Sequence, residues 1–175
     1  MNLFAYKDFF PKISPNVFIA SGVKIIGNVE IFEDSSVWYN TVIRGNINYI
    51  RIGLMTNIQD NSVLHVTGKN PLIIGNKVTI GHSAVLHGCR VEDSCLIGTG
   101  SIVLDNAVIE EKSIISAGAL VTPNFVVPSG KLAAGVPAKV IRELSESEIN
   151  ELEDIAKRYK NYSEIAKGSL ENSNG

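Results

Sequence analysis

The chain contains three histidines, and all of them fall between residues 65 and 87. They are His65, His82 and His87. Neutral imidazole is the commonest protein ligand for zinc and related divalent ions. Three imidazoles concentrated in one short segment therefore predict a metal site, provided that the fold brings them together.

The elements that must position the histidines follow a six-residue repeat of aliphatic residues. Neither an amphipathic helix nor an alternating strand has this period. It is typical of a parallel β-helix, in which each six-residue rung is one short strand plus a corner and three rungs close a triangular coil. The sequence thus predicts an all-β fold, a parallel β-helix of hexapeptide repeats. The first positions of the rungs are Ile13, Ile19, Ile25, Ile31, Val37, Ile43, Ile52, Ile58, Leu64, Ile74, Ile80 and Leu86, and then, after a one-residue slip, Val91, Ile97, Val103, Ile109, Ile115 and Val121.

The rung count predicts how two of the histidines are related in space. Rungs begin at 37, 43, 52, 58, 64, 74, 80 and 86 if residues 44–51 and 67–73 form outward insertions. Three rungs then separate position 64 from position 86. His65 and His87 consequently occupy the same position one coil apart, where their side chains can converge on one ion. Arg44 holds that position one coil earlier.

The third histidine, His82, occupies a different position in its rung and faces another side of the prism, with Asp60 one coil before it. We therefore expect a site shared between subunits, with His65 and His87 from one chain and His82 from a neighbour. A three-sided prism with such sites favours a cyclic homotrimer.

Composition excludes several classes of protein. No apolar run reaches the roughly 20 residues of a membrane span, and the N-terminus has no signal-peptide pattern. A net charge of −2 without a Lys/Arg cluster argues against nucleic acid as a partner. The two cysteines, Cys89 and Cys95, lack C-x-x-C spacing, so we expect a cytoplasmic protein. Cys95 is assigned to the core, and Cys89, close to the histidines, is a weaker candidate ligand.

The repeat gives way to a helical pattern near the C-terminus. Ser145 and Glu148 have the spacing of a capping box. Apolar residues then recur at helical intervals, which predicts one helix over about 145–166, packed along the prism and ended by Gly168. The expected organisation is a β-helix domain (1–144), a C-terminal helix (145–167) and a disordered tail (168–175).

From Val37 through Ala138 the chain resembles the gamma-class carbonic anhydrases, a family of left-handed parallel β-helix trimers. The stretches that carry the resemblance are V-W-Y-N-T-V-I-R-G-N (37–46), I-R-I-G-L-M-T-N-I-Q-D-N-S-V-L-H (50–65) and I-G-H-S-A-V-L-H-G-C (80–89). A closing A-G-V-P-A-K is shared with many hexapeptide proteins, acyltransferases included, and adds little. The resemblance is to the shorter branch of the family that lacks an acidic loop. It implies a left-handed β-helix and reversible hydration of CO2 to bicarbonate.

The resemblance also implies a metal-dependent mechanism at a subunit interface. His65, His82 and His87 correspond to ligands of Zn²⁺, or of Fe²⁺ or Co²⁺. Three neutral imidazoles leave the ion its full charge and an open coordination position. Such an ion lowers the pKa of its bound water from 15.7 to about 7, and the resulting hydroxide attacks the carbon of CO2.

Five further residues take roles from the resemblance. Gln59 and Asn57 correspond to amides that orient the metal-bound solvent and CO2, although amides at these positions could equally form a structural ladder along a β-helix corner. Tyr159 corresponds to a helix tyrosine that reaches over the site. Arg44 and Asp60 correspond to a pair that holds neighbouring subunits together.

Two departures from the family pattern bear on the rate. The Arg-Gly-Asp motif reads here Arg44-Gly45-Asn46, which removes a carboxylate beside the arginine. The loop V-T-G-K-N-P (66–71) has no acidic residue that could carry a proton away from the metal-bound water. We therefore expect slow or buffer-dependent turnover.

Two other functions compete with CO2 hydration. A hexapeptide acyltransferase would bind an acyl-coenzyme A between prisms, but it needs a catalytic-base histidine on an extended loop, and all three histidines here fit metal positions. A non-catalytic scaffold would use the metal only to lock its trimer.

Overall fold

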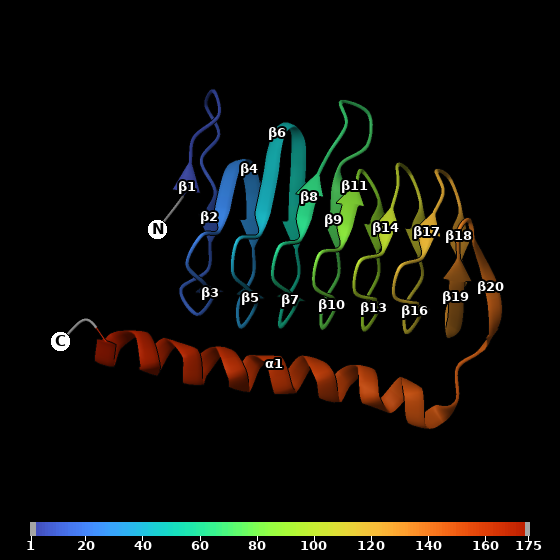
Figure 1. The fold of residues 1–175 in the computed structure, drawn as a ribbon. Helices are drawn as coiled ribbons and strands as arrows, with labels where there is room; N and C mark the ends of the chain where they lie inside the picture. The colour runs from blue at the N-terminus through green and yellow to red at the C-terminus, as the bar shows by residue number, and fades with distance from the viewer. Residues whose placement is uncertain (1–2, 174–175) are drawn as a thin grey trace.

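A computed structural model describes residues 3–173 as a parallel β-solenoid of about seven turns with a single long helix along one side (Figure 1). Short strands recur along the coils, and equivalent strands of successive coils pair in parallel. The predicted parallel β-helix with a C-terminal helix is thus confirmed.

The strands form three faces of a prism. One face is an eight-stranded sheet, and the other two belong to a twelve-stranded sheet whose long strands β4 and β6 pass from one face to the next. The eight-stranded sheet contains β3 (Phe18–Ile19), β5 (Ser36–Val37), β7 (Asn57–Ile58), β10 (Thr79–Ile80), β13 (Leu96–Ile97), β16 (Ile114–Ile115), β19 (Lys131–Gly135) and β20 (Ala138–Glu143). The twelve-stranded sheet contains β1 (Leu3–Phe4), β2 (Lys12–Ile13), β4 (Lys24–Ile31), β6 (Val42–Ile52), β8 (Val63–His65), β9 (Leu72–Ile74), β11 (Val85–His87), β12 (Arg90–Val91), β14 (Ile102–Val103), β15 (Val108–Ile109), β17 (Leu120–Val121) and β18 (Val126–Val127).

The core is a stack of aliphatic side chains contributed by the first position of each rung. Ile43, Leu64 and Leu86 lie opposite one another in successive coils, and each is fully buried. Ile58 and Ile80 pair in the same way on the eight-stranded face. These registers are those predicted from the rung count, because any other register would move the aliphatic positions out of the core.

The first of the two expected insertions is an outward bulge inside a strand. Residues 44–51 lie within β6, whose register with β4 jumps from Gly27–Gly45 to Val29–Ile50. Four residues, 46–49, therefore stand opposite Asn28 alone, and Ile47 among them is 54% exposed. The other insertion projects as a loop between β8 and β9 (Figure 1).

The helix α1 (Glu146–Ser173) begins at the predicted capping box. The Ser145 N–H donates to Glu148 Oε2 at 2.9 Å, and the Glu148 N–H donates back to Ser145 Oγ at 3.3 Å. Leu152 and Ala156 are buried on its inner side. No helix among residues 3–173 is long and apolar enough to cross a membrane.

The C-terminal boundary of α1 differs from the expectation. The helix continues through Gly168 to Ser173, because a glycine inside a helix costs only about 1 kcal/mol and does not by itself end it. Residues 168–173 of the predicted tail lie within these bounds of α1, and residues 174–175 lie outside the described part of the chain.

Candidate metal centre

The pairing of β8 with β11 places His65 directly opposite His87. The Nδ1 atom of His65 lies 3.0 Å from Nε2 of His87. Two nitrogens bound to one tetrahedral zinc ion at about 2.0–2.1 Å are separated by about 3.3 Å, so this pair needs little adjustment to hold an ion. Arg44 lies opposite His65 in the preceding coil, as the rung count predicted.

The environment of His65 favours the neutral form that binds metals. Partial burial lowers its pKa below the usual 6.5, and the positive charges of Arg44 and His87 lower it further. Asp105 acts in the opposite direction. The second ring nitrogen, Nε2, lies 3.1 Å from Asn46 Oδ1, an oxygen that can accept a hydrogen bond from an Nε2–H.

His87 is held by a residue that the sequence did not single out. Its Nδ1 lies 2.6 Å from Oδ1 of Asp105. Asp105 follows β14, and the one-residue slip in the repeat brings it beside Gly88 instead of beside His87 itself. A rung count that carried this slip through would have placed Asp105 next to the histidine pair.

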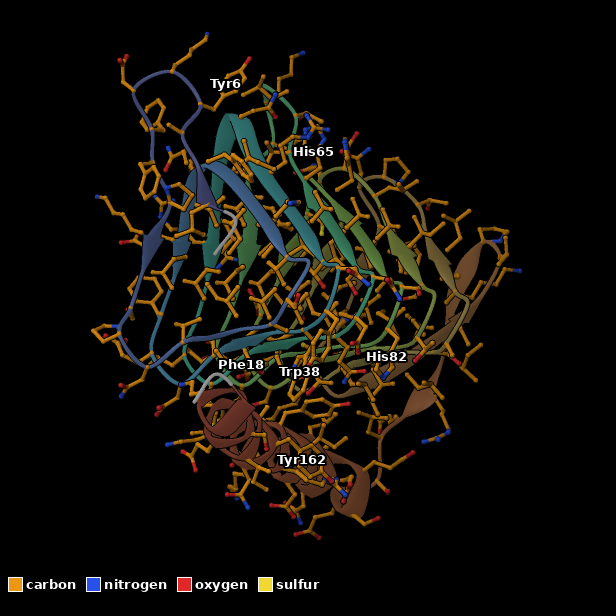
Figure 2. The ribbon with its side chains drawn as sticks, turned by 60° about the vertical axis from the view of Figure 1, so that its left-hand side comes forward. Tyr6, Phe18, Trp38, His65, His82 and Tyr162 are labelled. Carbon is orange, nitrogen blue, oxygen red and sulfur yellow. The ribbon has the colours of Figure 1, made fainter. Side chains whose placement is uncertain are left out.

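His82 lies on another side of the prism, just after β10 and close to α1 (Figure 2). Its Nδ1 lies 2.8 Å from Oδ2 of Asp60, the residue one coil earlier. Asp60 thus has a partner within the chain, whereas Arg44 donates to Asn46 Oδ1 at 3.1 Å. Among the residues that the structure describes, no group of three His, Cys, Asp or Glu side chains is arranged to hold a metal ion within one chain.

An aromatic pocket of about 480 Å³ opens beside His82. Tyr159 from α1 packs edge-on against Trp38, with 5.8 Å between ring centroids, and Tyr162 packs edge-on against Tyr159. Burial raises the pKa of the Tyr159 phenol, and the Asp60 carboxylate raises it further. Tyr159 therefore remains a neutral hydrogen-bond donor at the rim of this pocket.

The two amides occupy a different environment. Gln59 Nε2 donates to Asn57 Oδ1 at 3.2 Å, and Asn57 Nδ2 donates to Thr79 Oγ1 at 2.8 Å. Both amides are buried. The Asn57–Thr79 bond joins neighbouring coils, the Gln59–Asn57 bond lies within one rung, and together they engage both polar atoms of the Asn57 side chain.

The weaker candidate ligand, Cys89, is buried, and burial raises the pKa of its thiol to about 12. A thiol must lose its proton to bind a metal, so Cys89 is unsuited to that role. Cys95 is buried in the core, as expected.

Comparison with known proteins agrees with the fold and with the histidine pattern. The chain is 51% identical over 157 residues to a carbonic anhydrase of Geobacillus kaustophilus, a match that covers 90% of this chain and 86% of the relative. It is 54% identical over 152 residues to a probable carbonic anhydrase of Methanocaldococcus jannaschii, covering 87% of this chain and 96% of that protein. A crystal structure of a putative acetyltransferase from Bacillus cereus superposes with a TM-score of 0.94 at 43% identity, over 95% of this chain and 96% of that one. No family model matches the chain.

The solenoid and its stacked histidines define a protein of the hexapeptide-repeat β-helix class. Within that class, the two carbonic anhydrase matches decide the family, because each is more than 50% identical over most of the chain. The chain belongs to the gamma-class carbonic anhydrase family.

Proposed function

We propose that this protein catalyses the reversible hydration of CO2 to bicarbonate at a divalent metal ion, Zn²⁺ in the first instance, held between two chains. The single observation that carries the proposal is the convergence of His65 Nδ1 and His87 Nε2 to 3.0 Å. His82 supplies the third ligand from a neighbouring chain, because it lies on a different side of the prism from this pair. Family membership supports the same reaction.

The metal, when bound, supplies a Lewis acid that makes its coordinated water acidic near neutral pH. The residues of the chain then position the reactants. The aromatic pocket beside His82 offers CO2 an apolar surface, and the neutral phenol of Tyr159 can donate a hydrogen bond to an oxygen of the substrate or product. Gln59 orients solvent with the part of its amide that does not bond Asn57.

Assembly into a homotrimer completes the site in this proposal. Arg44 is exposed, next to the histidine pair, and Asp60 is half-buried next to His82. A trimer that brings these two edges together also brings opposite charges together. Breaking such a pair from one side leaves an uncompensated charge, so both residues contribute to assembly before they contribute to chemistry. The two cysteines are unpaired, which supports a reducing compartment such as the cytoplasm.

One alternative has a specific observation behind it. The structurally similar Bacillus cereus protein is described as a putative acetyltransferase. Transfer from an acyl-coenzyme A needs a catalytic-base histidine on an extended loop, whereas His65 and His87 lie on the paired strands β8 and β11 and His82 lies two residues after β10. Protection of the protein against thermal unfolding by acetyl-coenzyme A, in the absence of metal, would favour the alternative.

Stopped-flow CO2 hydration by metal-free and zinc-reconstituted protein tests the proposal. We expect activity only with zinc, loss of activity in His82→Ala, and a rate that rises with buffer concentration because the loop 66–71 has no acid to carry protons. Thr99→Ala is the matched control, since Thr99 is exposed at the corner one coil beyond His82. Tight zinc binding without hydration above the buffer rate would contradict the enzyme and leave a metal-locked scaffold.

A further inference from the structure

Each of the three imidazoles is bonded through one ring nitrogen to an oxygen atom, and the nitrogen differs between them. His87 and His82 use Nδ1, whereas His65 uses Nε2. We propose that Asp105 and Asn46 are positioning residues that fix the tautomers of His87 and His65, so that the ion binds Nε2 of His87 but Nδ1 of His65. The inference rests on the proposed metal site and assigns the ligand atom and its support for both members of the pair.

Asp105 fixes the tautomer of His87. An ionised carboxylate can only accept a hydrogen bond, so the 2.6 Å contact requires the proton of the neutral ring to be on Nδ1. Nε2 then keeps its lone pair. A carboxylate partner also makes the imidazole a stronger metal ligand and holds the plane of the ring.

The backbone beside His87 makes room for this carboxylate. A Cβ atom at Gly88 would lie 2.9 Å from Asp105 Oδ1 and 3.1 Å from the Cβ atom of Asn70. The φ of 52° at Gly88 is shared by non-glycine residues elsewhere in the solenoid, such as Met55, so the close approach of Asp105 is what distinguishes this position. The corner after His87 is thus shaped around the Asp105 side chain.

Asn46 fixes the tautomer of His65. The amide oxygen and nitrogen of an asparagine look alike, and the neighbours decide which is which. Arg44 can only donate, and its Nη1 lies 3.1 Å from Asn46 Oδ1, so the atom facing both neighbours is the oxygen. The 3.1 Å contact with His65 therefore requires the proton on Nε2, which leaves the lone pair on Nδ1.

The consequence is two lone pairs that face each other. Nδ1 of His65 and Nε2 of His87 lie 3.0 Å apart, and the neutral tautomers just derived put a hydrogen on neither. An N–H···N hydrogen bond between the rings would require one of them to give up its bond to Asp105 or Asn46. A cation between the two nitrogens satisfies both lone pairs and keeps both outer bonds.

The two supports are unequal in charge. Asp105 is an anion, and Asn46 is a neutral amide whose oxygen is already shared with Arg44. A charge-assisted hydrogen bond is stronger than a neutral one. We therefore expect metal affinity to depend more on Asp105 than on Asn46.

Nuclear magnetic resonance of ¹⁵N-histidine-labelled protein tests the assignment directly, because the chain contributes three imidazoles to the spectrum. With ¹¹³Cd²⁺ as the probe, we expect cadmium to couple to Nε2 of His87 and to Nδ1 of His65. Single His→Ala variants assign the signals. Coupling to Nδ1 of His87 or to Nε2 of His65 would overturn the proposal. This test needs no substitution of Asp105 or Asn46.

Zinc titration of metal-free variants provides the second test. Loss of an outer partner of a ligating histidine typically weakens metal binding by about 10–100-fold, and we expect that range for Asp105→Asn, together with a mixed tautomer of His87 in the metal-free spectrum. Asn46→Leu should weaken binding less, and Asn46→Asp should retain or strengthen it because the oxygen acceptor is kept. Asp93→Asn is the control, since Asp93 bonds Asn76 instead of a histidine.

The outcomes separate this inference from the proposed function. Wild-type protein that binds no zinc or cadmium would overturn both. Wild-type protein that binds zinc tightly, with folded Asp105→Asn and Asn46→Leu variants of equal affinity, would overturn the positioning roles alone.

Discussion

The two parts of the proposed metal site are positioned by different means. On one side, His65 and His87 belong to adjacent strands, so the ladder of parallel backbone hydrogen bonds sets their distance. On the other side, His82 follows a strand at a corner, and its side chain is 49% exposed compared with 33% for His87. Its neighbours are one carboxylate and the aromatic pocket formed with α1.

This difference shows what a short repeat can and cannot do for a functional site. The repeat places two side chains at identical positions of successive coils, and their convergence is then built into a single chain. In the proposed site the third ligand, His82, comes from another face and from a second chain.

Mixing two inactive chains gives the largest expected effect. In trimers assembled at random from equal amounts of His65→Ala and His82→Ala chains, about a quarter of the interfaces would combine an intact His65–His87 pair with an intact His82. We expect both zinc binding and CO2 hydration to reappear at about that level after the variants are unfolded and refolded together.

The control mixes His65→Ala with His87→Ala. These two ligands come from the same side, so every interface lacks one of them and no recovery is expected. Recovery in the control, or none in the first mixture, would mean that the three histidines are not divided between chains in this way.

A stability comparison sharpens the contrast between the two sides. Leu86 is fully buried directly before His87, and Leu152 is buried on α1. Replacing either by alanine should lower the free energy of unfolding by about 2–5 kcal/mol, as measured by denaturant titration. We expect Leu86→Ala to weaken zinc binding as well, because it loosens the strand that carries His87.

Leu152→Ala serves as the matched control, since it removes the same atoms from the helix and leaves the β8–β11 ladder intact. Its zinc affinity should remain close to that of the wild type in assembled protein. Equal losses of affinity in both variants would indicate that the ladder does not hold the histidine pair independently of α1.

The same division explains which features the sequence predicts. The stacking of His65 on His87 follows from the hexapeptide period, because the buried positions Leu64 and Leu86 allow only one register. The outward insertion at 44–51 was predicted from the same period, and the register of β6 on β4 has its extra residues there, between Gly45 and Ile50. The sequence does not predict that Gly45 and Ile50 both stay paired with β4, because such pairing depends on the neighbouring coil.

Asp105 escaped the sequence interpretation for a related reason. The slip in the repeat sets Asp105 opposite Gly88, one residue beyond His87, and the Asp105 side chain reaches His87 beside the space that Gly88 leaves. The predicted end of α1 at Gly168 was wrong, because a single glycine was taken as a stop signal without regard to the rest of the helix.

The smallest expected effect concerns the start of α1, on the His82 side. Arg142 bonds the Glu148 carboxylate through both terminal nitrogens at 2.8 Å, and the Ser145 N–H and hydroxyl add two further bonds. These bonds lower the pKa of Glu148 to about 2, and the bond with Arg142 contributes more than either of those with Ser145. A carboxyl whose pKa is lower in the folded state than in the unfolded state stabilises the fold at neutral pH.

That stabilisation is fully present above the ordinary pKa of 4.5 and is lost as the pH falls from 4.5 towards 2. In metal-free protein at pH 7, Glu148→Gln should therefore melt about 2 °C below the wild type, and this gap should close at pH 2. Glu146→Gln, in the same turn but outside these bonds, should show no such gap. Arg142 belongs to β20, so these bonds join the start of α1 to the eight-stranded sheet. A gap that persists at pH 2 would mean that the cap stabilises α1 through shape instead of charge.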